Sequence, residues 1–220
     1  AEIRAHLEAE NAYMEAQLAD TRPLQEALFQ EMKGRIKEDD SSVPSPDGAY
    51  EYSVGYVTGG QYARLLRRNR DSSGEVVLLD GNREAEGKPY WQLGDSAHSP
   101  DHKLLAYAVD DKGSELFTIR FRDTATGRDL ADEITDTRGG FVWSKDGRTL
   151  FYVRLDANHR PLYVYRHTVG TAAENDVLVY EDADAAPGTR ALYVDIAGRA
   201  DARESVPVAV STRNKTGRRE

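Results

Sequence analysis

The sequence contains no cysteine and no long apolar run, and each absence excludes a class of protein. Without cysteine the chain cannot form disulfides, bind zinc through thiolates, hold an iron–sulfur cluster or use a catalytic thiol. This composition is compatible with a reducing compartment, so we expect a cytoplasmic protein. The longest fully apolar run, 104–109, is far shorter than the about 20 residues that cross a bilayer. We therefore expect no association with a membrane.

Basic residues are also fewer than acidic ones. The 220 residues include 29 Lys and Arg against 38 Asp and Glu, which gives a net charge of −9 with histidine neutral. Electrostatic binding of nucleic acid needs a basic face that releases counterions. An acid excess leaves room only for a local basic patch, so we expect no nucleic-acid partner. The first residues carry no basic-then-apolar signal pattern.

Residues 1–40 have the pattern of two helices that form an N-terminal arm. The apolar positions that share a face are Leu7, Met14 and Leu18, then Leu24, Leu28, Met32 and Ile36. Thr21 followed by Pro23 indicates a helix start, so we expect one helix to end near residue 20 and the next to run from about 22 to 37. Each apolar stripe is narrow and needs a covering partner, because short helices are marginal in water.

Beyond residue 41 the apolar period changes from four to two, which predicts strands. Tyrosines alternate with polar residues over 50–56, and Phe117, Ile119 and Phe121 do the same further on. Turn signals rich in glycine and aspartate separate the strands up to about residue 195. The last segment, 197–220, offers one short apolar run, and we expect an irregular or frayed tail.

One turn occurs three times, beginning at residues 45, 99 and 144. The copies read Ser-Pro-Asp-Gly, Ser-Pro-Asp-His and Ser-Lys-Asp-Gly, and they lie 54 and 45 residues apart. The phase persists beyond the turn, since Leu105 and Tyr107 fall opposite Leu150 and Tyr152. A period near 45 with about four strands per unit is typical of β-propeller blades.

The fold class predicted is therefore mainly β: a partial β-propeller of about three four-stranded blades over 41–196, starting near 45, 99 and 144, after a helical segment over 1–40. A β-sandwich with coincidental Asp-Gly turns is the alternative, and the shared phase after the turn favours the propeller. A fourth blade would begin at 191–196. An open set of blades exposes sheet faces, so we expect a tendency to self-associate.

Six segments carry a resemblance to a known family. They are ENAY at 10–13, IKEDDSSVP at 36–44, LLDGN at 78–82, AYAVDDKGSE at 106–115, LFYV at 150–153 and NHRP at 158–161. Together they resemble, in order and with nearly the same spacing over about residues 4–196, the N-terminal half of the oligopeptidase B group of the prolyl oligopeptidase family of serine peptidases. After Tyr180 the chain departs from the family's pattern, which we interpret as a truncated or rearranged product.

The resemblance implies a helical segment that packs on a C-terminal α/β-hydrolase domain and a propeller that caps its active site. It also implies hydrolysis of short peptides after Lys or Arg by a Ser-Asp-His triad. A nucleophile elbow needs Gly-x-Ser-x-Gly, and no serine here has glycine both two residues before and two residues after it. We therefore expect no catalytic residue in these 220 residues and no activity of the chain alone. The alternative is a stand-alone propeller module for binding or scaffolding, similar to TolB.

Other polar groups favour structural roles. His98 and His102 are four apart, but a Ser-Pro-Asp turn between them removes the helical geometry that would pair them as metal ligands, so we predict a surface role. The acids Asp110, Asp111, Asp123, Asp182 and Asp184 fit no calcium loop, which makes them turn or surface acids. We expect no metal site and no cofactor.

Two basic clusters and both tryptophans also have structural interpretations. Arg64, Arg67, Arg68 and Arg70 indicate a half-exposed strand and its turn, while Arg213, Lys215, Arg218 and Arg219 form too short a run for a nucleic-acid arm. Trp91 and Trp143 precede two of the repeat turns and are predicted to pack between blades.

Overall fold

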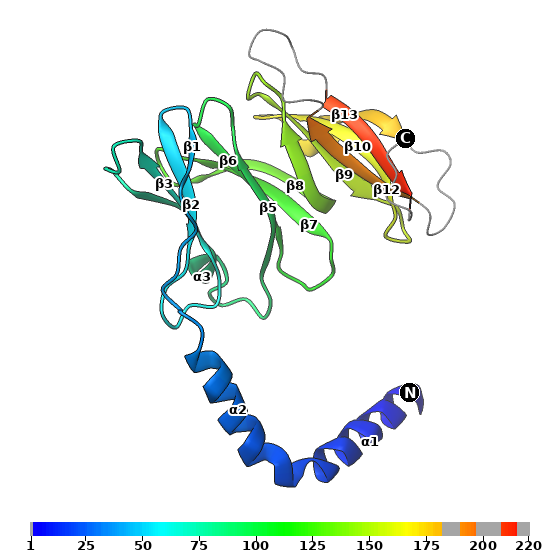
Figure 1. The fold of residues 1–220 in the computed structure, drawn as a ribbon. Helices are drawn as coiled ribbons and strands as arrows, with labels where there is room; N and C mark the ends of the chain where they lie inside the picture. The colour runs from blue at the N-terminus through cyan, green and yellow to red at the C-terminus, as the bar shows by residue number, and fades with distance from the viewer. Residues whose placement is uncertain (1, 182–189, 197–207, 215–220) are drawn as a thin grey trace.

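The computed structural model describes residues 2–181, 190–196 and 208–214, which form a helical arm followed by antiparallel sheets (Figure 1). The helices are α1 (Glu2–Gln17), η1 (Ala19–Thr21), α2 (Arg22–Gly34), α3 (Gly81–Glu84) and η2 (Ala173–Asn175). The strands are β1 (Ser45–Asp47), β2 (Tyr50–Gly55), β3 (Arg64–Asn69), β4 (Val76–Asp80), β5 (Gln92–His98), β6 (Leu104–Asp110), β7 (Phe117–Asp123), β8 (Asp129–Trp143), β9 (Thr149–Leu155), β10 (Pro161–Thr168), β11 (Val177–Glu181), β12 (Arg190–Ile196) and β13 (Val208–Asn214). The predicted fold class, a partial β-propeller after a helical segment, is confirmed.

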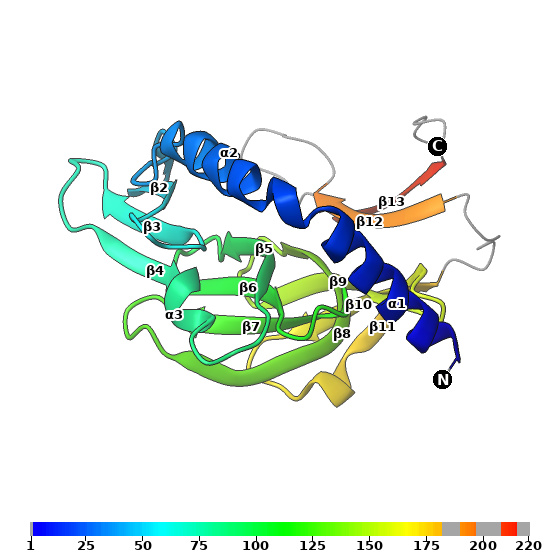
Figure 2. The ribbon, with the colours of Figure 1, turned by 90° about the horizontal axis from the view of Figure 1, so that it is seen from below.

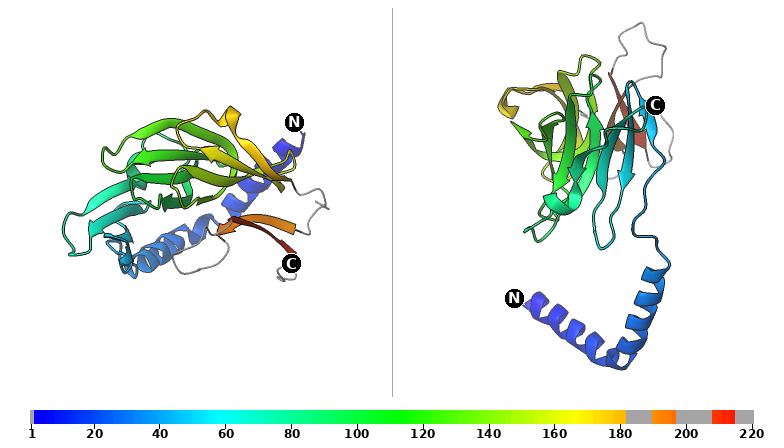
Figure 3. Two further views of the ribbon diagram at one scale, coloured as in Figure 1. Left: turned by 90° about the horizontal axis from the view of Figure 1, so that it is seen from above. Right: turned by 90° about the vertical axis from the view of Figure 1, so that its left-hand side faces the viewer.

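The arm projects away from the sheets as two consecutive helices (Figure 3). The chain turns between them at η1, and Pro23 occupies the first turn of α2, as the sequence predicted. Helix α2 ends at Gly34, before the predicted residue 37, although the apolar spacing continues to Ile36. Beyond it the backbone bonds tighten to i→i−3, from Arg35 N to Met32 O and from Ile36 N to Lys33 O. No residue of α1 or α2 is buried. Within the described residues, no helix combines the length and the apolar content that crossing a membrane requires.

The strands form consecutive antiparallel meanders. Strands β1 to β4 make one sheet, β5 to β11 make a seven-stranded sheet in chain order, and β12 pairs with β13. Strand β12 lies where the sequence predicted the beginning of a fourth blade. The tail was predicted to be irregular over 197–220, and this is wrong for residues 208–214, which pair with β12 along its whole length. The remaining tail residues lie outside those described.

The repeat turns lie inside the sheets, and each joins the first and second strands of a four-stranded unit. The three units are β1 to β4, β5 to the first part of β8, and the last part of β8 to β11. Strand β5 precedes the second turn and pairs with β6, and the end of β8 precedes the third turn and pairs with β9. The second and third units therefore begin before residues 99 and 144, because the turn closes a hairpin rather than opening a blade. Ser99 Oγ donates to Asp101 Oδ1 at 2.6 Å and accepts from Leu104 N at 3.0 Å.

Strand β8 belongs to two units at once. Its first part pairs with β7 and its last part pairs with β9, while Thr137 is paired with both neighbours. Between these parts the register shifts, and Asp136 and Gly139 have φ angles of 58° and 94°. A side chain at 139 would place its Cβ 2.8 Å from the Phe117 ring, so glycine is needed where the strand bends from one unit to the next.

The core lies on both faces of β6. This strand lies between β5 and β7 in the seven-stranded sheet (Figure 2). Leu105, Tyr107 and Val109 pack with Leu78, Leu79 and Trp91 of the first unit and the loop after it. Ala106 and Ala108 face the other way, into a cluster that contains Trp143, Leu150 and Tyr152 of the third unit. The longest apolar run of the sequence is therefore apolar throughout because neither of its faces meets water. Both tryptophans pack between units, as predicted.

Asp110 closes the turn after β6 and gives the first testable prediction. Its side chain is 1% exposed, and it accepts backbone N–H bonds from Lys112, Gly113 and Glu115 at 2.7–2.9 Å. Burial alone would raise the pKa of Asp110, but these donors outweigh burial and hold the pKa below its usual value. Asp110→Asn should lower the free energy of unfolding by about 2 kcal/mol at pH 7, because an amide offers one neutral acceptor oxygen in place of the two charged oxygens that accept these bonds.

The difference between the wild type and Asp110→Asn should shrink with acid. A lowered pKa in the folded state adds stability above the unfolded-state pKa, near 4, and loses it as the pH falls through the folded-state pKa. Urea unfolding at pH 7 and pH 3 measures this, with Asp111→Asn as the control because Asp111 accepts none of these bonds. Equal losses at both pH values would contradict the assignment.

Candidate functional site

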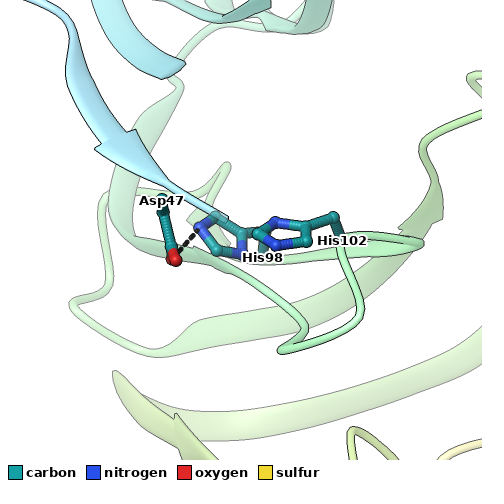
Figure 4. Close-up of side chains that lie close together, drawn as sticks. All are labelled: Asp47, His98 and His102. Atoms are coloured by element: carbon teal, nitrogen blue, oxygen red, sulfur yellow. Dashed lines mark ion pairs between the residues drawn. The ribbon is translucent and has the colours of Figure 1, made fainter. Parts of the chain in front are cut away.

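The main cluster of polar and titratable side chains lies where the first sheet meets the second. Asp47 ends β1, Tyr52 lies on β2, His98 ends β5 and His102 occupies the fourth position of the second repeat turn. That turn position has a left-handed backbone, with φ of 61° at His102 and 54° at the equivalent Gly48. The bend turns the His102 side chain back toward His98 and the first sheet (Figure 4).

The rings of this cluster stack closely. The Tyr52 and His98 rings have centroids 4.1 Å apart at an interplanar angle of 16°, and the His98 and His102 centroids are 4.8 Å apart. The Tyr52 hydroxyl lies 2.7 Å from His102 Nδ1, and His98 Nε2 lies 3.3 Å from Asp47 Oδ2. His98 and His102 are both half-buried. Their predicted surface role is thus wrong in part, because the turn that removed the helical geometry brings the two rings together by another route.

A neighbouring arginine also contacts the cluster. Arg67 Nη1 donates to the His102 carbonyl oxygen at 2.8 Å and to Thr124 Oγ1 at 3.2 Å, and its guanidinium lies 4.4 Å from the centre of the Tyr50 ring. Burial, followed by the proximity of His98, lowers the pKa of His102. Burial also raises the pKa of Tyr52, so its hydroxyl keeps its proton at neutral pH.

A groove of about 380 Å³ adjoins these residues between the first and second sheets. Asp47, Tyr52 and His98 line one part of it, and leucines line the rest. Its serines are Ser42, Ser45, Ser53 and Ser96. Among the described residues, no serine hydroxyl is hydrogen bonded to a histidine ring, and the hydroxyl that contacts a ring nitrogen is that of Tyr52.

The second unit contains a polar network that ties three strands together, with Tyr107 buried and Asp129 exposed. The Tyr107 hydroxyl donates to Asp129 Oδ2 at 2.7 Å, and Arg122 Nε donates to Asp129 Oδ1 at 2.7 Å. Arg122 also pairs with Glu84 at 3.0 Å, which joins β7 to the short helix α3 of the neighbouring unit. Burial, followed by the bond to Asp129, raises the pKa of Tyr107. Every group is satisfied, which indicates a structural role.

The third unit repeats this network with a histidine in the place of the arginine. His167 lies 45 residues after Arg122, and its Nδ1 is 2.7 Å from Asp176 Oδ1, while Tyr152 donates to the same carboxylate at 2.7 Å. His167 Nε2 is 3.2 Å from Asp132 Oδ2, and the ring is fully buried. Both ring nitrogens face carboxylates, so His167 cannot serve as a base for a nucleophile. Sequence reasoning missed this equivalence because the repeat conserves position here and not residue type.

The other groups singled out in the sequence have the predicted surroundings where the structure describes them. Asp123 caps its own turn by accepting from Ala125 N and Thr126 N at 3.0 and 2.7 Å. Arg64, Arg67 and Arg68 are half-buried on β3. Asp182, Asp184, Lys215, Arg218 and Arg219 lie outside the described residues, and of Arg213 only the backbone, in β13, is described.

The chain is similar in sequence and in structure to known proteins. The sequence profile of the prolyl oligopeptidase N-terminal β-propeller domain matches residues 1–200. Dipeptidyl aminopeptidase BI of Pseudoxanthomonas mexicana is 42% identical over 200 residues, covering 83% of this chain and 28% of that protein. Protease 2 of Moraxella lacunata is 28% identical over 191 residues, again covering 83% and 28%. Oligopeptidase B from Leishmania major has a TM-score of 0.86 at 29% identity, covering 96% of this chain and 29% of that one. The chain spans less than a third of the length of these relatives.

His167 provides a test of the structural role of its network. His167→Gln should lower the free energy of unfolding by about 3 kcal/mol, because two buried carboxylates, Asp132 and Asp176, each lose the ring nitrogen that faces them. Urea denaturation followed by tryptophan fluorescence measures the change. Arg166→Gln, at the exposed neighbour on the same strand, should stay within about 0.5 kcal/mol of the wild type. Similar midpoints for both variants would show that the network does not stabilise the fold.

Proposed function

The chain belongs to the prolyl oligopeptidase family, and we propose that it caps the C-terminal catalytic domain of a peptidase of this family and has no hydrolytic activity alone. The cap would exclude large folded substrates and water from the active site, which is a gating role. We further propose that the whole enzyme acts on short peptides in the cytoplasm and cleaves them after Lys or Arg.

The exposed apolar face of the arm is the observation that carries this proposal. Leu24, Leu28 and Met32, one turn apart along α2, are 61%, 46% and 59% exposed. On α1, Leu7 and Met14 are 58% and 50% exposed. Helices of this length are marginal in water unless an apolar face is covered. The relatives extend far beyond the matched residues, so the covering partner we propose is the catalytic domain that follows in those longer chains.

The base of the arm is held to the first sheet, which directs the apolar face. Glu38 accepts from Gly59 N at 2.9 Å in the loop after β2 and pairs with Lys33 of α2 at 3.2 Å. The Gly59 bond, followed by Lys33, lowers the pKa of Glu38, so this carboxylate stays charged at neutral pH. A domain docked on the arm would thereby be placed at one defined side of the propeller.

The preference for basic peptides is supported by charge. An excess of nine acidic residues produces a negative field that raises the local concentration of cationic peptides. The name of the Pseudoxanthomonas relative describes release of dipeptides, whereas the Leishmania structure is an oligopeptidase B. Kinetics of the whole enzyme on chromogenic Arg-Arg and dipeptide substrates distinguish these specificities.

Docking of the arm is testable with separated parts. The 220-residue chain should co-elute in size-exclusion chromatography with the part of the Pseudoxanthomonas enzyme that lies beyond the matched residues. Leu24→Asp combined with Leu28→Asp should weaken this binding at least about tenfold, because two charges would be buried in an apolar contact. Gln30→Asp, on the opposite face of α2, is the matched control and should bind like the wild type.

Two outcomes would contradict the docking proposal: no co-elution of the wild-type chain, or equal binding by the paired aspartate variant and its control. The open sheet faces would also allow self-association, which sedimentation of the chain alone measures. A ring-shaped homo-oligomer would favour the stand-alone scaffold module instead.

The absence of activity is tested directly. The purified chain should release no chromophore from an Arg-Arg substrate, because none of its described histidine rings is hydrogen bonded to a serine hydroxyl. Turnover that a serine-reactive inhibitor abolishes would show that the chain carries a catalytic serine.

A further inference from the structure

Two hydrogen-bond acceptors face each other at His98 and Asp47. His98 Nδ1 lies 3.0 Å from the Ser99 carbonyl oxygen, which can only accept, so Nδ1 carries the hydrogen. In a neutral ring the Nε2 atom then has a lone pair, and it is 3.3 Å from Asp47 Oδ2. A lone pair and a carboxylate at this separation repel each other unless a cation lies between them. A metal ion bound by both atoms would remove this repulsion.

His102 can hold its hydrogen in the same way. Its Nδ1 is 2.7 Å from the Tyr52 hydroxyl, which can donate to that nitrogen or accept from it. In the tautomer with the hydrogen on Nδ1, the Nε2 atom of His102 is an acceptor on the side of the first repeat turn, where a Cβ on Gly48 would lie only 2.7 Å away. Gly48 directly follows Asp47, so the Nε2 atom of His102 comes close to the same turn as the Nε2 atom of His98.

We propose that Nε2 of His98, Nε2 of His102 and a carboxylate oxygen of Asp47 form a three-ligand site for a divalent transition metal of the zinc class. One ligand atom from each residue lies within 4.8 Å of the other two (Figure 4). Two ligands about 2.0–2.2 Å from a tetrahedral zinc ion are separated by about 3.4 Å, close to the distance found between His98 and Asp47. Small side-chain rotations bring the third ligand in.

The donor set and its surroundings suit this class of metal. Imidazole with a carboxylate favours zinc, cobalt and nickel over calcium and magnesium, which take oxygen ligands. Metal-binding histidines typically donate their second nitrogen to a carbonyl or another fixed oxygen, which orients the ring. His98 does so toward Ser99, and His102 can do so toward Tyr52, whose hydroxyl both donates and accepts. With three protein ligands, the fourth position remains open to solvent or to a ligand atom from outside.

Asp47 differs from its counterparts in the other repeats, and this difference points to the same site. Asp101 and Asp146 accept from the serine two residues before them and so complete their own turns. Asp47 has no such bond to Ser45 among the described contacts, and its carboxylate, whose side chain is 59% exposed, turns toward His98 instead. A bound metal would therefore link the first repeat turn to the second and hold two units together.

The experiment uses the full untagged chain, with Zn²⁺ and Co²⁺ as the probes. Calorimetry should detect one Zn²⁺ per chain, and Co²⁺ should give the visible absorption of a tetrahedral site that excess Zn²⁺ removes. His98→Gln and Asp47→Asn should each weaken binding at least about tenfold, since each removes a ligand. His159→Gln, at an exposed histidine in the β9–β10 turn, is the control and should bind like the wild type.

A second variant keeps all three ligands. Gly48→Ala should weaken binding because its Cβ would displace the His102 ring, and circular dichroism shows whether each variant is folded. Bound Zn²⁺ should also raise the thermal midpoint of the wild type and leave that of His98→Gln unchanged. The proposal is overturned if the wild type binds Zn²⁺ no more tightly than His98→Gln.

Discussion

The structure depends on one constraint: a sheet whose two faces are both apolar must be covered on both sides. Strand β6 presents Leu105 and Tyr107 to one neighbour and Ala106 and Ala108 to the other, and all four side chains are buried. A four-stranded unit with this pattern cannot fold as an isolated sheet, since each buried large side chain contributes roughly 1.5–3 kcal/mol only when it is covered. The need to cover both faces explains why the units stack and why both tryptophans are buried. It also explains why the first two repeat turns lie close together.

The elements that depend on local chemistry could be predicted from the sequence. Ser99 and Asp101 form their turn with atoms at most five residues away, so the repeated motif was sufficient to identify hairpins at the right places. The helix start at Pro23 is equally local. Position 102 shows the limit of such a pattern, because His102 adopts the left-handed conformation that glycine adopts in the other two copies.

What could not be predicted depends on contacts between units. The approach of Asp47 to His98 joins residues 51 positions apart and results from the stacking of two sheets, which no periodicity encodes. The equivalence of Arg122 and His167 was hidden because different side chains meet an aspartate from the same strand position. Strand β13 escaped prediction for a related reason, since its pairing with β12 is the main constraint on a segment of weak pattern. In each case the structure depends on which residue or strand lies opposite in space, and the local sequence does not specify that partner.

The continuity of β8 has a consequence for how the chain folds. One continuous strand, β8, completes the second unit and begins the third. Once the second unit is folded, the last part of β8 is therefore already extended and can pair with β9. Nearly all strand pairs are between chain neighbours, so loop-closure entropy is small at each step. The sheets can therefore assemble in the order in which a ribosome delivers them, each unit nucleating the next, with cooperativity that passes along the chain as it does in repeat proteins.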